Sequence, residues 1–247
     1  MKEFTEQVQQ HLEEEKKRSH GSSLAEIILG GQDGLVNVLG IVLGVASATS
    51  NVFIVLIAGL VATFAESISM AAVAYTSTRA EQDHYWAELK QEKWEIEHVP
   101  EVETEEIRLI YMKKGFRGAE LERMVKSITS NKELWISIMM TEELGLAPIE
   151  TQNPVRAAGI VGVSAFVGSV IPLIPFAFLP VQTAMVASLV IATIVLFSVG
   201  AYKAKITVGS WYKSGLEMAV VGMLAAIVGW LVGKFLGDWF GLKNLPT

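Results

Sequence analysis

Residues 24–78 read LAEIILGGQDGLVNVLGIVLGVASATSNVFIVLIAGLVATFAESISMAAVAYTST. This stretch contains two apolar runs, at about Leu24–Thr49 and Val52–Thr78, and a short turn at residues 50–51 separates them. A helix needs about 20 apolar residues to cross a bilayer, so each run is long enough to span one. The stretch therefore predicts two membrane-spanning helices in immediate succession.

Three further apolar runs lie in the second half of the chain, at about Val155–Leu179, Gln182–Tyr202 and Leu216–Phe240. Hydrophobic residues make up 51% of the 247 residues and charged residues 19%, and the two classes are segregated along the sequence. This pattern predicts an all-α polytopic membrane protein with five transmembrane helices and a helical insert between spans two and three. The expected segments are a polar N-terminal segment at 1–23, spans one and two at 24–78, the insert at 79–153, spans three to five at 154–241 and a tail at 242–247.

The distribution of lysine and arginine predicts the orientation of these spans. All but Lys234 and Lys243 of the 20 Lys and Arg residues fall on one face of the five-span arrangement. By the positive-inside rule, the N-terminal segment and the insert are therefore expected in the cytosol. Because the chain has no obvious sorting extension, we expect the cell membrane rather than a vacuolar membrane, which stays open as the alternative. The first twenty residues fit a short surface helix and solvated disorder equally well.

The insert is predicted to be helical throughout. Neither Gly nor Pro occurs from Tyr75 to Val99, so the second span is expected to continue as one long helix until Pro100 ends it. Shorter helices are expected at about Glu103–Lys114, Gly118–Ser130 and Asn131–Leu144.

Composition excludes some kinds of site and partner. The chain has no cysteine, which rules out thiolate ligands for copper(I) or structural zinc. The net charge is −6 and no basic stripe with interleaved aromatic residues occurs, so nucleic acid is not expected as a partner.

Two acids lie inside the first two apolar runs, Asp33 in the first and Glu66 in the second. A charge at membrane depth costs a few kcal/mol on insertion scales, so such acids indicate an ion or proton site. Asn37 lies one helical turn beyond Asp33, and Met70 one turn beyond Glu66, so all four could line a path for a dehydrated divalent ion. The alternative for Asp33 is a shallow position where it caps a helix and faces water.

The insert carries a second set of candidate ligands, at helical spacing. These are Glu92, Glu95, Glu103, Glu106, Met139, Met140 and Glu143. Like charges three or four residues apart destabilise a helix, and a bound cation would relieve the repulsion. Carboxylates with a thioether nearby would suit Fe²⁺, Mn²⁺ or Co²⁺ better than Mg²⁺. The alternative is that these acids form solvated helix faces, with the methionines in the core.

Glu95-x-x-His98 matches half of a di-iron carboxylate site, and this leaves a membrane-anchored iron oxidase open as an alternative. A metal sensor that does not transport is a third hypothesis. Gly40-x-x-x-Gly44 marks a candidate helix-packing face in the first span.

Five motifs occur here in the order and spacing of the vacuolar iron transporter family, which the chain resembles from about residue 24 onward. They are Asp33-Gly34-Leu35, Ser69-Met70, Asp83-His84-Tyr85 before an acidic helix, Trp135…Met139-Met140…Glu143-Leu-Gly-Leu146, and Pro172-Leu-Ile-Pro175.

The resemblance implies a homodimer of five-span subunits that exchanges cytosolic Fe²⁺, or the related ions Mn²⁺ and Co²⁺, for protons, with the pore where two copies meet. It implies no prosthetic group, since the metal is the substrate. By motif position, the family's cytosolic metal ligands correspond to the seven residues of the insert named above, and its transport-path residues to Asp33 and Met70. In the plant-type pattern the second-span acid lies where this chain has Ala62, so Glu66, one turn later on the same face, is expected to replace it.

Overall fold

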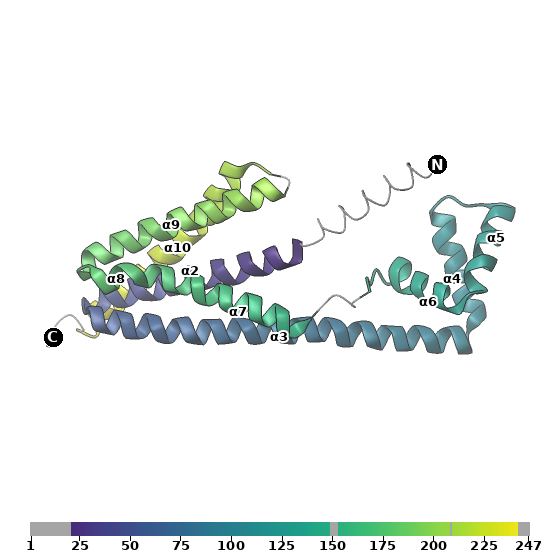
Figure 1. Cartoon of the computed structure of the whole chain (residues 1–247), viewed down its shortest axis with the longest axis horizontal. Coiled ribbons are helices and arrows are strands. Elements are labelled where there is room, and N and C mark those ends of the chain that lie inside the picture. The colour runs from purple at the N-terminus through teal and green to yellow at the C-terminus, as the bar shows by residue number, and fades with distance from the viewer. Residues whose placement is uncertain (1–20, 149–152, 208, 242–247) are drawn as a thin grey trace, which may run out of the picture. The chain divides into compact units, whose positions relative to one another are not determined.

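The computed structural model describes residues 21–148, 153–207 and 209–241, and these residues form helices and the turns between them (Figure 1). They divide into two compact units. One comprises the described residues up to Tyr75 and from Val155 onward, and the other comprises Thr76–Pro154. The predicted N-terminal segment up to residue 20 and the tail at 242–247 lie outside the described residues.

Among the described residues, five helical stretches are long and apolar enough to cross a membrane, as the sequence predicted. They are α2 (Gly21–Thr49), α3 (Val52–His98), the stretch Pro154–Phe178, α9 (Val181–Ile206) and α10 (Trp211–Trp239). The third stretch consists of α7 (Pro154–Val170), the 3-10 turn η2 (Ile171–Leu173) and α8 (Ile174–Phe178). This break coincides with Pro172 and Pro175, because proline has no backbone N–H to donate to the preceding turn. The fifth span begins at Trp211 rather than at the predicted Leu216.

Within the first unit, α2 packs against both α9 and α10 (Figure 1). Glycines let α2 and α10 approach backbone to backbone. A Cβ atom added to Gly229 would lie 2.2 Å from the carbonyl oxygen of Gly40, and one added to Gly233 would lie 1.9 Å from that of Gly44. The Gly40-x-x-x-Gly44 motif is therefore a helix-packing face, as its spacing predicted.

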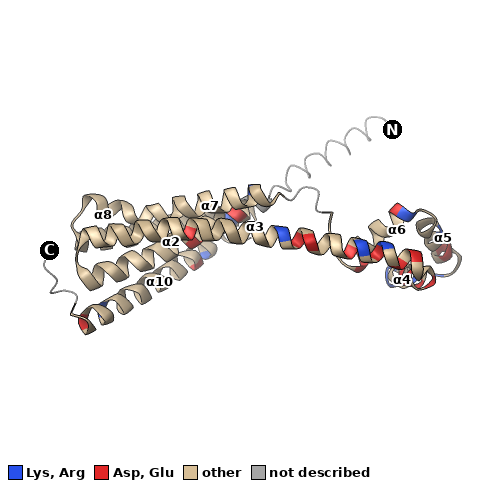
Figure 2. Cartoon of the chain, turned by 90° about the horizontal axis from the view of Figure 1, so that it is seen from below, with Lys and Arg blue, Asp and Glu red and all other residues tan. Residues whose placement is uncertain are grey.

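The second unit contains the end of α3, α4 (Pro100–Lys113), α5 (Gly118–Thr129), α6 (Lys132–Ile138) and the π-helical turn η1 (Met139–Glu143). The continuous α3 through His98 confirms the predicted long helix. Charged residues gather on this unit, whereas the apolar spans carry few (Figure 2). Its apolar core includes Ile107, Val125, Met139 and Met140.

The helix after Pro100 begins earlier than predicted. The sequence predicted a start at about Glu103, but α4 begins at Pro100 itself. Proline is well suited to the first helical position, since its missing N–H would have no partner there and its φ angle is already helical. The same proline thus separates α3 from α4 and starts α4, and it places Glu103 in the first turn of α4.

Candidate metal centre

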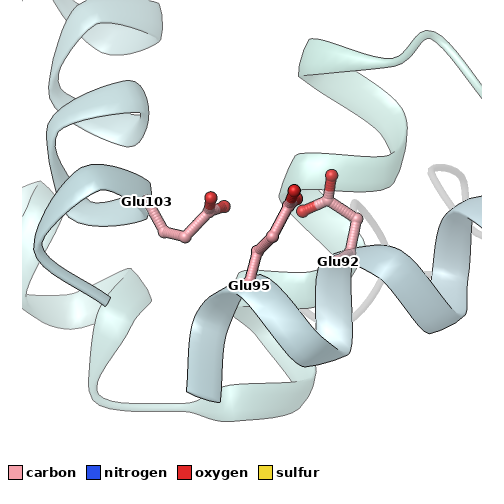
Figure 3. Close-up of side chains that lie close together, drawn as sticks. All are labelled: Glu92, Glu95 and Glu103. Atoms are coloured by element: carbon pink, nitrogen blue, oxygen red, sulfur yellow. The ribbon is translucent and has the colours of Figure 1, made fainter. Parts of the chain in front are cut away.

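Three glutamates of the second unit converge across the α3–α4 corner (Figure 3). Glu92 and Glu95 lie one turn apart near the end of α3, and Glu103 lies in the first turn of α4. One carboxylate oxygen from each of the three lies within 4.8 Å of the others. The turn at Val99–Pro100 brings Glu103 back to α3, so the cluster depends on this corner as much as on helical spacing.

Two of these carboxylates are buried, and in each of them one oxygen has no hydrogen-bond partner among the described residues. Glu92 is 4% exposed and Glu103 is 3% exposed. The Oε2 atom of each makes no hydrogen bond in the described part of the chain. A buried charged oxygen without a partner costs several kcal/mol, and a bound cation would remove that cost.

The third carboxylate is held in place by a neighbour. Glu95 is half-buried, and its Oε1 accepts a hydrogen bond of 2.7 Å from Nε2 of Gln91, one turn earlier on α3. Such a bond fixes the direction of a candidate ligand. Gln91 is not among the residues predicted from the sequence, although its spacing of four residues from Glu95 could have indicated the contact.

Burial and mutual repulsion raise the pKa of the two buried acids to about 7. For Glu92 burial is the main cause, followed by the charges of Glu103, Glu143, Glu95 and Glu106. For Glu103 burial again acts first, followed by Glu106, Glu95 and Glu143. The pKa of Glu143 is raised for the same reasons, burial first. Near neutral pH the cluster therefore holds protons that a divalent cation would displace.

The remaining insert candidates surround this group. Glu106 lies on α4 and Glu143 at the end of η1, and both contribute to the field at the cluster. Met139 and Met140 begin η1 and are buried in the apolar core of this unit. Their burial fits the alternative that they are core residues, and their thioethers remain candidate ligands. A π turn has no evident signal in the local sequence, and such turns are frequent at functional sites.

The di-iron alternative finds no support in the position of His98. Its ring stacks on Trp94 at 4.5 Å between centroids, and its Nδ1 lies 2.8 Å from the carbonyl oxygen of Trp94. Within the described ranges, the group of closely placed ligand side chains holds glutamates and no histidine.

The membrane candidates form a separate group between α2 and α3 of the first unit. Nδ2 of Asn37 donates a hydrogen bond of 3.1 Å to Oε1 of Glu66, and the carboxyl group of Asp33 lies against that of Glu66. Met70 lies one turn further along α3 and is half-buried. Asp33 lies well inside α2, so it does not cap that helix.

The fold and these two groups define a class, a five-span membrane protein with a pair of acids between two spans and a carboxylate cluster in its helical insert. Comparison with known proteins assigns the chain to a family within this class. The chain matches the VIT family over residues 24–234, and it belongs to that family.

Its relatives carry the names of transporters. "Vacuolar iron transporter 2" of Oryza sativa subsp. japonica is 33% identical over 89% of this chain and 90% of its own length. "Vacuolar iron transporter 1" of Arabidopsis thaliana is 32% identical over 89% and 88%. "Vacuolar iron transporter" of Plasmodium falciparum is 33% identical over 87% and 82%.

Proposed function

We propose that this chain transports divalent metal ions across its membrane. The substrate is Fe²⁺, with Mn²⁺ and Co²⁺ as related ions, and export from the cytosol occurs in exchange for protons. Transport of a metal ion is supported by membership of the VIT family and by the names of the relatives. The identity of the ion, the direction of transport and the coupling to protons go beyond this support and are proposed.

One observation supports metal binding by the insert. Glu92 and Glu103 each bury a carboxylate oxygen that has no hydrogen-bond partner in the described part of the chain, within 4.8 Å of a third carboxylate. Protein sites avoid this arrangement unless protons or a cation neutralise it. In the proposed mechanism the insert collects the ion, and the metal displaces the protons held there.

The acid pair between α2 and α3 is proposed to carry the ion through the membrane. Asp33 and Glu66 together provide negative charge for a divalent ion, or bind protons once it has left. The thioether of Met70 would add a soft ligand that disfavours Mg²⁺ and Ca²⁺. Cytosolic placement of the insert follows from the lysine and arginine distribution and remains a prediction, as does a cell membrane rather than a vacuolar one.

We further propose that two copies pair across this site. The Asn37 side chain is exposed on the surface of the single chain although it lies well inside a membrane-spanning helix. An amide exposed to lipid is costly, and a second copy would cover it. Because the chain has no cysteine, Asn37→Cys provides a single thiol for a test. A homodimer predicts a disulfide-linked dimer in membranes, whereas Phe53→Cys, exposed near the start of α3, serves as the comparison.

The function is tested by Fe²⁺ uptake into proteoliposomes with and without an imposed pH gradient, comparing the wild type with Asp33→Ala. Uptake that needs the gradient and disappears in the variant supports proton-coupled transport. Glu103→Ala and Glu106→Ala should weaken metal binding in calorimetry, and an unchanged titration would contradict the assignment of the ligands. Wild-type protein that binds iron without moving it points to a sensor, and oxygen consumption with Fe²⁺ points to an oxidase.

A further inference from the structure

An open cavity of about 560 Å³ lies between the last turns of α9 and the start of α10. It is part of the first unit, and neither the acid pair nor the carboxylate cluster contributes to it. Its walls include Ala201, Ala204 and Lys205 of α9 and Trp211 of α10. The cavity thus combines an apolar surface, an aromatic ring and a cation.

The packing of the two helices explains why the cavity opens here. A Cβ atom added to Gly200 would lie 2.5 Å from the carbonyl oxygen of Ser214 and 2.9 Å from Cα of Gly215. The helices therefore touch backbone to backbone at this level. Beyond it, α9 continues for six residues to Ile206, and the described residues leave the space between its last turns and Trp211 unfilled.

The described residues that line the cavity include one cation, Lys205, and no acid. Lys205 lines it, Lys203 lies on the same turn of α9, and Lys213 lies in the first turn of α10. The first turn of α10 contains no acid, and Ser210 makes no side-chain cap, so the N–H groups of this 29-residue helix add partial positive charge. A cavity of this kind fits an anion.

The aromatic residues place this anion site at the membrane surface. Tyr202, Trp211 and Tyr212 are all at least half exposed at the ends of two membrane-spanning helices. Tyrosine and tryptophan concentrate at the level of the lipid headgroups, and basic pockets between spans bind anionic headgroups. A soluble anion would need no apolar walls, whereas the glycerol and first acyl carbons of a lipid would contact Ala201 and Ala204.

We propose that this cavity binds one anionic phospholipid, with its phosphate at Lys205 and its glycerol region between α9 and Trp211. The site is distinct from the path of the metal ion, and it does not depend on the transport function. It gives the α9–α10 hairpin a specific lipid partner rather than a general attraction to membrane charge.

Native mass spectrometry of the purified full chain in detergent tests this, with phosphatidylglycerol and phosphatidylcholine titrated separately. We expect one tightly bound phosphatidylglycerol and no comparable binding of phosphatidylcholine. Lys205→Gln should weaken the binding of phosphatidylglycerol by more than the roughly fivefold that general surface attraction assigns to one lysine. Lys203→Gln is the matched control, because it removes the same charge from the same turn without lining the cavity.

A second variant tests the shape of the cavity separately from its charge. Ala201→Phe would fill the cavity without altering any charge, and it should also abolish specific lipid binding in protein that elutes normally in size exclusion. If this variant does not fold, the comparison between Lys205 and Lys203 still decides the matter. Equal losses in the two lysine variants, or equal binding of the two lipids by the wild type, would overturn the proposal.

Discussion

The side-chain amide of Asn37 on α2 donates a hydrogen bond to the carboxylate of Glu66 on α3, with 3.1 Å between Nδ2 and Oε1. Asp33, one turn before Asn37, also lies against Glu66. The acid of the second span is thus in contact with the acid of the first, although it lies one turn later than in the plant-type pattern. This contact supports Glu66 as the residue that takes the place of the acid absent at Ala62.

Glu66→Gln separates the structural part of this contact from its charge. A glutamine can still accept the hydrogen bond from Asn37, so the variant should fold normally. It cannot release a proton, and it removes one of two negative charges from the path. Metal flux in proteoliposomes should therefore fall roughly tenfold or more and lose its response to the pH gradient. Glu217→Gln, an exposed acid in α10, should transport normally, and equal flux in both variants would contradict a role for Glu66.

The five spans could be predicted from the sequence because length and apolarity alone decide which segments can cross a bilayer. The long α3 was predictable because no Gly or Pro interrupts it before Pro100. The start of α4 was predicted three residues late, since Pro100 both separates two helices and begins the second. The helical pattern predicted that Glu92 and Glu95 share a face, as the structure shows.

Other features depend on tertiary structure and could not be predicted in this way. The angle between α3 and α4 at their corner decides whether Glu103 lies close to Glu92. The spacing of residues along the sequence does not indicate this angle. The π turn that begins with Met139 likewise follows from the packing of the insert, whereas the burial of Met139 and Met140 agrees with the alternative, stated from the sequence, that they are core residues. Gln91 differs from these features, because its spacing of four residues from Glu95 is a sequence signal for the contact that the structure shows.

Metal binding to the insert should depend steeply on pH. Burial and the neighbouring carboxylates raise the pKa of Glu92 and of Glu103 to about 7, so both are largely protonated below that pH. A divalent ion must displace these protons, so its affinity should rise roughly tenfold or more from about pH 6 to about pH 8 and then level off. Calorimetry with Co²⁺ in two buffers of different ionisation enthalpy would count the released protons. Equal affinity at both pH values without proton release would contradict a site at these residues.

Replacing a ligand should stabilise the metal-free protein. Because the folded pKa of Glu103 lies above the unfolded value of 4.5, its neutral form favours folding below about pH 4.5, and this contribution is lost as the pH rises through about 7. Glu103→Gln keeps the side chain neutral, so its apparent Tm without metal should exceed that of the wild type by several degrees at about pH 8. At about pH 4.5 the difference should be small.

The control for this prediction is Glu122→Gln. Glu122 is exposed, and its pKa is lowered because it accepts hydrogen bonds from Arg108 on α4. Removing its charge should leave the apparent Tm at about pH 8 unchanged or slightly lower, and metal binding should persist. Glu103→Gln should in contrast weaken metal binding. A Glu103→Gln variant that is less stable than the wild type at about pH 8 would show that repulsion in the cluster does not limit stability.

The glycine contact between α2 and α10 should be intolerant of even one methyl group. A Cβ atom on Gly233 would lie 1.9 Å from the carbonyl oxygen of Gly44, which is backbone and cannot rotate away. Gly233→Ala must therefore push the helices apart, at a cost of about 1–3 kcal/mol, and lower the temperature of unfolding in detergent. Gly159→Ala on α7 is the matched control, since no atom lies within 4 Å of its added Cβ and alanine favours the helix by up to about 1 kcal/mol. If both variants unfold at the same temperature, the close approach of α2 and α10 does not contribute to the stability of the bundle.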